Sequence, residues 1–282
     1  MILIDYNAIA IASVIGGMED MIEEGLARHS ILNTIRLYRS KYKEQYGEVI
    51  ICCDGPHNWR KDVFPQYKHK RKNARKESKI DWNELYRCTD LVLQEIRENF
   101  PYKVIAEDNS EADDIIAAIC ASTQEFGAHE EVMIISGDKD FVQLQKWSNI
   151  HQFSPSAKKE LKEERPRAQL LNLILGGDTS DGIPNVLNPD NTFVDEIRQK
   201  PLRANIRAQL IQDPKSMGDD VYNNMKRNKK LIDLCETPDR VVKEILYTYK
   251  ESGKAIADRG KVFPYLVDKR CRVLLDYIED FI

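Results

Sequence analysis

Five clusters of acidic residues are the part of this sequence best suited to catalysis. They lie beside short apolar runs or glycine-bearing turns, and they are Asp5, Asp54, and residues 111–114, 138–140 and 178–181. Each cluster alone is ordinary turn or helix-cap chemistry. Together, their carboxylates would repel one another and raise their own pKa values unless cations neutralised them. Two divalent ions about 4 Å apart would do so and would clamp a scissile phosphate, so the pattern predicts a two-metal phosphodiester hydrolase.

The cysteine and histidine residues indicate no other metal. The six cysteines form no C-x-x-C pair and the five histidines show no ligand-like spacing, so we expect buried free thiols and no zinc site. Carboxylate oxygens are hard ligands. We therefore expect Mg²⁺ as the cofactor, as two ions, with Mn²⁺ as a substitute.

A basic segment stands out in residues 60–79. It contains nine Lys or Arg and only two acidic residues, within a chain whose formal charge is −4. Trp59, Phe64 and Tyr67 are interleaved with these charges, a pattern that suits an unpaired nucleic-acid strand whose bases stack on aromatic rings. A solvated lysine-rich helix face is the alternative. The candidate nucleic-acid contacts are Arg60, Lys61, Tyr67, Lys70, Lys72 and Arg75.

The elements that would position these residues follow an α/β pattern. Buried strands are predicted at residues 2–4, 49–53, 103–106 and 132–135, separated by segments long enough for crossover helices. This predicts a mainly parallel central sheet flanked by helices, with the acidic residues at the carboxyl ends of its strands. We expect two domains, an α/β catalytic core over residues 1–155 and a helical C-terminal domain over residues 156–282 that contributes Asp178 and Asp181.

Composition excludes several other classes of protein. The chain has 282 residues, 42% of them hydrophobic, with 46 acidic against 42 basic residues. This balance argues against a disordered protein and against a globally basic, histone-like one. No apolar run is long enough for a membrane span, so we expect a soluble protein without a secretory signal.

The order of the motifs resembles the 5′-nuclease family, which includes flap endonucleases and the 5′-exonuclease domains of bacterial DNA polymerases. The resemblance spans roughly residues 1–190 and continues more weakly beyond them. The matching motifs are Asp5, Asp54, Tyr67-Lys68-x-x-Arg71, Glu111-Ala112-Asp113-Asp114, Ser136-Gly137-Asp138-Lys139-Asp140 and Gly177-Asp178-x-x-Asp181-Gly182-Ile183-Pro184.

The resemblance implies a role for each matching residue. It implies that the ligands around a first metal are Asp5, Asp54, Glu111 and Asp113. Those around or near a second would be Asp138, Asp140, Asp178 and Asp181, and Asp114 matches a further acidic position of the motif. Lys68 and Arg71 match the cations beside the scissile phosphate, where they would act as catalytic residues. Residues 60–79 match the arch or bridge that a free 5′ strand passes through, which we expect to be mobile without DNA.

The resemblance also implies an activity and partners. It implies a Mg²⁺-dependent 5′ nuclease with 5′-3′ exonuclease, flap endonuclease and ribonuclease H activity, which removes RNA primers and adjoining DNA from lagging-strand fragments. The substrates would be branched or nicked DNA and RNA–DNA hybrid with a free 5′ end. We expect a monomer in the cytoplasm of a phage-infected host, with a single-stranded-DNA-binding protein as a partner and no membrane.

One segment departs from the family. Its members commonly continue with a Gly-x-Gly turn of a helical hairpin that grips duplex DNA and often a K⁺ ion, whereas this chain reads Asn185-Val186-Leu187-Asn188-Pro189-Asp190. The departure places that duplex clamp, and any K⁺ site, in question. Alternative duplex contacts are Lys226, Arg227, Lys229 and Lys230, which could equally form a solvated face.

Three other functions stay open from the residues alone. A non-catalytic module could hold branched DNA with the basic segment, although acidic residues in its cleft would repel phosphates. A PIN-type single-strand ribonuclease would share the strand-tip acids but is usually about half this length. A haloacid-dehalogenase-like phosphatase fits poorly, because its Asp-x-Asp follows the first strand, whereas Asp138-Lys139-Asp140 follows the fourth predicted one.

Overall fold

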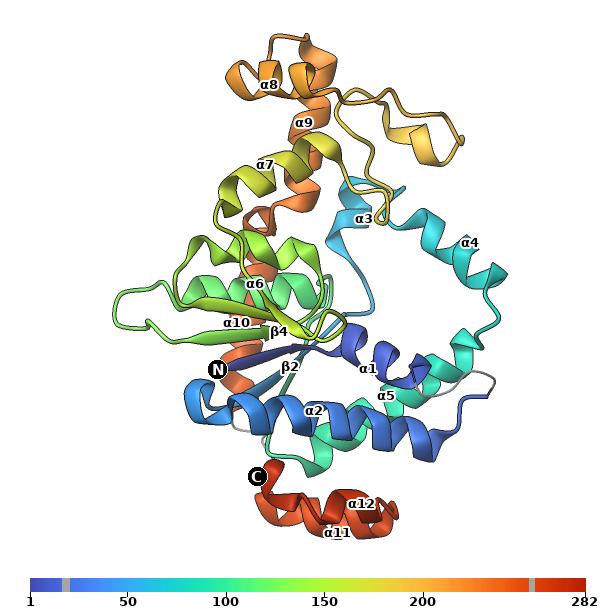
Figure 1. The fold of residues 1–282 in the computed structure, drawn as a ribbon, viewed down its shortest axis with the longest axis vertical. Coiled ribbons are helices and arrows are strands. Elements are labelled where there is room, and N and C mark those ends of the chain that lie inside the picture. Colours follow the sequence, from blue (N-terminus) through green and yellow to red (C-terminus); the bar gives the residue numbers. More distant parts are fainter. Residues whose placement is uncertain (17–20, 254–256) are drawn as a thin grey trace. The chain divides into compact units, whose positions relative to one another are not determined.

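The computed structural model describes residues 1–16, 21–253 and 257–282. They form two compact units (Figure 1). Unit 1 comprises residues 1–57, 80–162 and 239–282, and unit 2 comprises residues 58–79 and 163–238. This division differs from the expected boundary at residue 155. The basic segment groups with the helical region, and the last part of the chain groups with the sheet.

Unit 1 is built on a six-stranded sheet with the order β3-β2-β1-β4-β5-β6. The strands are β1 (Ile2–Asp5), β2 (Val49–Cys53), β3 (Lys103–Ala106), β4 (Val132–Ile135), β5 (Ile150–Ser154) and β6 (Lys159–Leu161). All neighbouring pairs are parallel except β5 and β6, which are antiparallel. The predicted mainly parallel sheet and its first four strands are confirmed, whereas β5 and β6 were not predicted.

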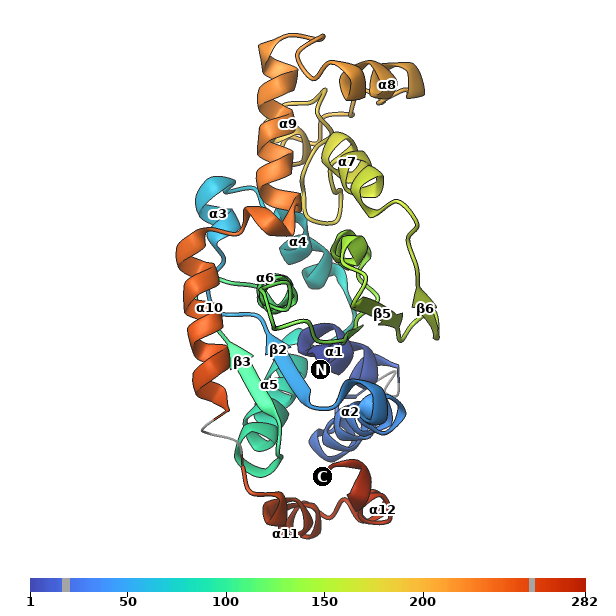
Figure 2. The same cartoon turned by 90° about the vertical axis from the view of Figure 1, so that its left-hand side faces the viewer.

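Helices cover both faces of this sheet (Figure 2). On one face lie α1 (Tyr6–Ile15), α2 (Glu24–Tyr46) and α5 (Trp82–Asn99), and on the other lie α6 (Ala112–Ser122) and α10 (Asp239–Ser252). Ile2 and Ile4 of β1 pack into the core beneath the first group of helices, since alternate strand residues point to the same face. A 3-10 helix, η1 (Lys139–Lys146), follows β4.

The end of the chain packs against unit 1. It contains η4 (Arg259–Lys261), α11 (Val262–Asp268), α12 (Arg272–Leu275) and η5 (Ile278–Asp280). Arg36 of α2 forms a 2.6 Å ion pair with Asp280, and Arg39 donates to the carbonyl oxygen of Ile282 at 2.6 Å. Between these contacts the Phe281 ring is fully buried, with its centroid 5.4 Å from that of Phe100. The final residues are therefore part of the core of unit 1.

Unit 2 is helical. It contains α3 (Trp59–Val63), α4 (His69–Glu77), α7 (Pro166–Gly176), η2 (Asp190–Phe193), α8 (Ala204–Gln212), α9 (Asp219–Ile232) and η3 (Leu234–Glu236). One of its apolar clusters joins Phe64 and Tyr67 of the basic segment to Ile183, Leu231 and Ile232. The basic segment is thus attached to this unit by apolar side chains. In the described part of the chain, no helix is long and apolar enough to cross a membrane.

Replacing Phe281 tests whether the end of the chain stabilises unit 1. The Phe281→Ala variant should lose about 3–5 kcal/mol of unfolding free energy, because it removes a fully buried ring and leaves a cavity. Phe263→Ala is the matched control, since 57% of Phe263 is exposed, and it should lose far less. Urea denaturation of both variants measures the difference, and equal losses would contradict this packing role.

Candidate functional site

The strand order places three acidic positions of unit 1 on neighbouring strand ends. β1 lies between β2 and β4, with Asp5 opposite Cys52 and Ile4 opposite Ile135. Asp5 ends β1, Asp54 directly follows β2, and Asp138 lies in the turn after β4. The connections run from β1 to β2 and β3 on one side and then to β4 on the other, which makes this edge the topological switch point where such sheets bind ligands.

Asp5 is the most buried of these three carboxylates. Its Oδ2 accepts a hydrogen bond from Ser136 Oγ at 2.9 Å, and its Oδ1 accepts from the backbone N–H of Ala8 at 3.2 Å, which caps α1. Burial raises the pKa of Asp5 to about 6, and the negative charges of Asp54 and Asp138 add to the rise, although both hydrogen bonds oppose it. A cation at this position would favour the ionised form.

Asp54 is exposed and is held by two donors. Its Oδ2 accepts from Asn7 Nδ2 at 2.7 Å, and its Oδ1 accepts from the N–H of Ala112 at 2.9 Å. The next residue, Gly55, donates to the carbonyl of Ser110 at 2.9 Å. A Cβ on Gly55 would lie 2.1 Å from the Glu107 oxygen, so only glycine allows the loop after β2 to approach the loop before α6.

Residues 111–114 form the start of α6. The Asp114 carboxylate is fully buried, and its Oδ2 accepts from the N–H of Glu111 at 3.0 Å as part of a capping box. Asp113 is partly exposed, and Glu111 is buried. Asp114 thus has a structural role at the helix start and orients the backbone that carries Glu111.

Asp138 and Asp140 begin η1. Asp138 Oδ1 accepts from the N–H of Asp140 at 2.9 Å, while its own N–H donates to Ser136 Oγ at 3.1 Å. Gln152 Nε2 donates to the carbonyls of Ser136 and Asp138 at 3.0 and 2.7 Å. Ser136 therefore links Asp5 to Asp138, and buried Gln152 supports the turn. We did not predict either as a site residue. Ser136 begins the motif that ends at Asp140, whereas Gln152 lies in β5, a strand that we did not predict from the sequence.

The donor chemistry of this edge fits a hard divalent cation. Asp5, Asp54 and Asp138 present carboxylate oxygens, the ligand type that such cations prefer, and the charges of Asp54 and Asp138 contribute to the raised pKa of Asp5. In residues 1–16, 21–253 and 257–282, however, no three His, Cys, Asp or Glu side chains have the arrangement of a metal site. Asp54 and Asp138 are thus close enough to Asp5 to raise its pKa, but the described carboxylates do not have the spacing of a preformed metal cage.

Asp178 and Asp181 lie in a tight turn of unit 2. Asp178 is buried, and its Oδ1 accepts from the N–H and Oγ of Ser180 at 2.8 and 2.6 Å. The backbone groups of Asp178 and Ile183 exchange two hydrogen bonds of 2.9 and 2.7 Å. Gly177, at φ +68°, is required there because a Cβ would lie 2.4 Å from the Ile183 oxygen. The turn therefore has a fixed backbone.

Asp181 contacts the two predicted catalytic cations. Its carboxylate accepts from Arg71 Nη2 at 2.6 Å and from the Tyr67 hydroxyl at 3.0 Å, and Lys68 Nζ lies 4.0 Å away. The Lys68 N–H also donates to the Asp181 carbonyl at 2.8 Å. Unit 2 thus brings together Lys68, Arg71 and Asp181, with 17% of the Lys68 side chain exposed.

The candidate nucleic-acid contacts divide into buried and exposed residues. Arg60 and Tyr67 are 2% and 4% exposed, and Arg60 Nε donates to the Leu231 carbonyl at 3.0 Å. Trp59 and Phe64 are buried as well. Contrary to the expectation of stacking on bases, these aromatic rings form part of the interior of unit 2, because burial removes their apolar surface from water.

The remaining candidate contacts lie on the surface. Lys61, Lys70 and Arg75 are exposed, with Lys70 Nζ 4.6 Å from the centroid of the Phe193 ring. The side chain of Lys72 lies outside the described part of the structure. The three exposed residues are therefore the ones whose placement suits contact with phosphates.

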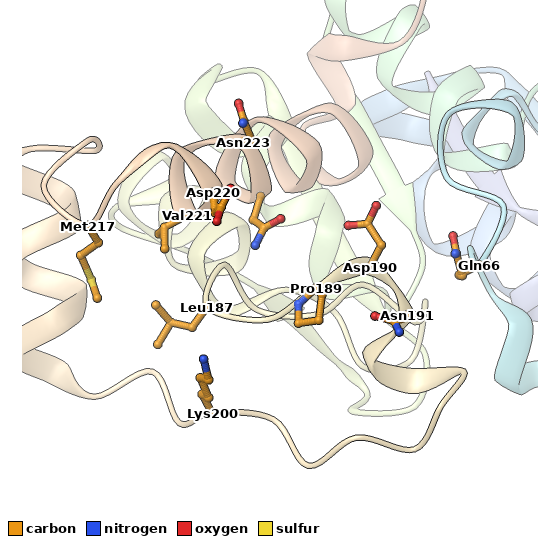
Figure 3. Close-up of a pocket in the computed structure, with 11 residues that line it drawn as sticks. Gln66, Leu187, Pro189, Asp190, Asn191, Lys200, Met217, Asp220, Val221 and Asn223 are labelled. Atoms are coloured by element: carbon orange, nitrogen blue, oxygen red, sulfur yellow. The ribbon is translucent and has the colours of Figure 1, made fainter.

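A cavity of about 700 Å³ lies within unit 2 (Figure 3). Its lining includes the amides Gln66, Asn191 and Asn223 and the apolar side chains of Leu187 and Met217. None of the predicted site residues lines it. Its walls are formed largely by the segment that departs from the family pattern and by the beginning of α9.

Two family models together match nearly the whole chain. The model described as 5′-3′ exonuclease, N-terminal resolvase-like domain, matches residues 2–170, and the model described as T4 RNase H, C terminal, matches residues 165–281. Ribonuclease H of Enterobacteria phage T4 is 31% identical over 99% of this chain and 95% of its own length. A flap endonuclease Xni of Shewanella oneidensis is 32% identical over 49% of this chain and 52% of its own length.

Solved structures show the same fold at low sequence identity. The flap endonuclease of bacteriophage T5, co-crystallised with metal ions, has a TM-score of 0.61 at 15% identity, over 89% of this chain and 98% of that one. A complex of the T5 enzyme with DNA and metal ions has a TM-score of 0.59 at 15% identity, over 90% and 98% of the two chains. The motifs, the sheet and the matched models agree: the chain belongs to the 5′-3′ exonuclease family of phosphodiester-hydrolysing nucleases.

Proposed function

We propose that this protein is a Mg²⁺-dependent 5′ nuclease that hydrolyses phosphodiester bonds near the 5′ end of a strand paired to a template. It would act as a 5′-3′ exonuclease, a flap endonuclease and a ribonuclease H. The observation that carries the proposal is the set of Asp5, Asp54 and Asp138 on adjacent parallel strand ends, in a chain of the 5′-3′ exonuclease family.

The proposed metal ligands are the carboxylates of the acidic motifs. They are Asp5, Asp54, Glu111, Asp113, Asp138, Asp140, Asp178 and Asp181. These carboxylates would hold two Mg²⁺ ions, which would activate a water molecule and stabilise negative charge on the departing oxygen. Asn7, Ser136 and Gln152 would orient ligands through the hydrogen bonds described above. Asp114 would act through the start of α6.

Lys68 and Arg71 would stabilise the charge that develops on the phosphoryl oxygens. Both lie beside Asp181, whose single carboxylate pairs with them and restricts their side-chain positions while leaving a net positive charge. A fixed ammonium and guanidinium need little reorganisation when the phosphate becomes more negative. Exposed Lys61, Lys70 and Arg75 would bind the strand through its phosphates.

The relatives support a role in DNA replication. They include proteins named ribonuclease H, flap endonuclease and 5′-3′ exonuclease, and a T5 relative was solved in complex with DNA. We propose that this chain removes RNA primers and adjoining DNA from lagging-strand fragments in the cytoplasm of an infected host. It would act as a monomer beside a single-stranded-DNA-binding protein.

Cleavage of an end-labelled 5′-flap duplex and of an RNA–DNA hybrid tests this function. Short 5′-phosphorylated products should appear with Mg²⁺ and disappear with EDTA and in the Asp138→Asn variant, because that variant loses a negatively charged ligand. A flap that is bound but stays intact would indicate a non-catalytic DNA-binding module. Preferential cleavage of unstructured RNA would indicate a single-strand ribonuclease instead.

Thermal unfolding with and without millimolar Mg²⁺ tests the carboxylate cluster. The pKa of Asp5, about 6, lies above its ordinary value of 3.8, so ionising this group destabilises the metal-free fold as pH rises through this range. Because only ionised Asp5 can ligate Mg²⁺, the rise in Tm should be larger at about pH 7.5 than at about pH 5. Asp5→Asn should raise the metal-free Tm at the higher pH and reduce the Mg²⁺ effect. An equal Mg²⁺ effect at both pH values would count against Asp5 as a ligand.

The Lys68→Ala variant tests transition-state stabilisation. Cleavage under single-turnover conditions should slow by roughly 10²–10³-fold with little change in flap affinity, because a contact made in the transition state affects the rate. Lys70→Ala provides the contrast, since an exposed phosphate contact should affect affinity more than rate. If Lys68→Ala weakened binding as much as it slowed cleavage, Lys68 would be an ordinary phosphate anchor.

A further inference from the structure

Three side chains of α9 hold the segment in which this chain departs from the family pattern. Asn224 Nδ2 donates to the carbonyls of Val186 and Asn188 at 3.0 and 3.1 Å. Asn228 Nδ2 donates to the carbonyl of Pro184 at 2.9 Å, and Arg227 Nη2 donates to the same oxygen at 3.1 Å. The carbonyls of residues 184, 186 and 188 are thus all directed toward amide or guanidinium donors of one helix.

Arg227 is the centre of this arrangement. Only 10% of its side chain is exposed, and its Nη1 also pairs with Asp190, at the far end of the same segment. Its Nε donates to Asn228 Oδ1 at 2.9 Å, which orients the amide that in turn donates to Pro184. Arg227 is therefore a structural cation within unit 2 and is not the exposed duplex contact considered from the sequence.

A second set of amides completes the attachment. Asn188, which is 2% exposed, donates through Nδ2 to Asn185 Oδ1 at 2.6 Å and accepts from the N–H of Lys200 at 2.9 Å. Asn185 Oδ1 also accepts from the N–H of Leu187 at 2.9 Å. The segment has side-chain partners on both sides, so its backbone is fixed without the Gly-x-Gly turn.

This attachment leads directly to the acidic turn. Pro184 follows Ile183, whose backbone exchanges two hydrogen bonds with Asp178. The same turn carries Asp181, which contacts Lys68 and Arg71. A shift of the Pro184 carbonyl would therefore displace Ile183 first and then both carboxylates of the turn.

We propose that Arg227, with Asn224 and Asn228, is a positioning residue for the reaction: it fixes residues 184–188 and thereby the placement of Asp178, Asp181 and the cations that Asp181 holds. The inference rests on the proposed nuclease function. In this role Arg227 itself contacts neither the substrate nor a metal. The buried guanidinium of Arg227 places a positive charge beside the Pro184 carbonyl.

Single-turnover cleavage of the 5′-flap duplex by Arg227→Ala and Arg227→Lys tests the proposal. Arg227→Ala should cleave about 10–100-fold more slowly, as expected when the support of a ligand is lost, and should need more Mg²⁺ for half-maximal rate. Flap affinity should stay within about 3-fold of wild type, because Arg227 touches no substrate in this proposal. Low millimolar guanidinium should restore part of the rate to Arg227→Ala. Arg227→Lys, which lacks the planar fork, should be intermediate.

Amide hydrogen exchange gives a readout besides activity. Exchange at Asp178 and Ile183 should accelerate in Arg227→Ala, while the strands of unit 1 keep their protection. Arg240→Ala is the matched control, because Arg240 lies on the exposed surface of α10 and pairs only loosely with Glu244, at 3.6 Å. It should resemble wild type in every measurement.

The outcomes separate this inference from the proposed function. If wild type cleaves and Arg227→Ala cleaves equally well, the positioning role is overturned and the nuclease function stands. If Arg227→Ala loses affinity and rate to the same degree, Arg227 is a DNA contact and the inference is also overturned. A wild-type protein that does not cleave overturns the proposed function and this inference together.

Discussion

The buried carboxylate of Asp5, with the charges of Asp54 and Asp138 beside it, is the constraint around which this edge of unit 1 is organised. A parallel sheet brings its carboxyl strand ends to one edge, and here that edge places the charge of Asp5 beside those of Asp54 and Asp138. Burial is the main reason that the pKa of Asp5 is raised, and the two neighbouring charges raise it further. Protonation of Asp5 or a bound cation would each relieve the repulsion. Ser136 and Gln152 are needed because repelling groups must be held in place.

The strands of the sheet were predictable to the extent that they are apolar. β1, β2 and β4 are fully buried apolar runs, which can be recognised as strands from the local sequence. Because parallel strands end at the same edge of a sheet, the acidic residues that follow them could be placed on that edge from the topology. β5 reads Ile-His-Gln-Phe-Ser, and β6 reads Lys-Glu-Leu with two exposed residues, so neither has the apolar run of a buried strand. The supporting role of Gln152 depends on β5 and could not be predicted without it.

The basic segment shows where local sequence reasoning fails. Aromatic residues among lysines are typical both of a nucleic-acid surface and of a helix packed on a neighbour, and the two cannot be separated without knowing that neighbour. Here Phe64 and Tyr67 pack with Leu231 and Ile232, more than 150 positions later in the chain. Lys61 and Lys70 are exposed, because a charged group gains from water in either arrangement. The domain division differed from expectation for the same reason: both segments contribute to one apolar cluster.

The two units neutralise their charges in different ways, and this difference bears on how a metal-dependent enzyme would be organised. In unit 2 the charge of Asp181 is met by Arg71 and Lys68, and the carbonyls of residues 184–188 are met by Arg227 and two amides. These positive groups belong to the chain itself. At the end of β1 the donors described for Asp5 and Asp54 are uncharged: the hydroxyl of Ser136, the amide of Asn7 and backbone N–H groups. Cations of the chain therefore hold Asp181 and the carbonyls of residues 184–188 in place, whereas the edge of the sheet presents carboxylate oxygens whose chemistry fits a hard divalent cation.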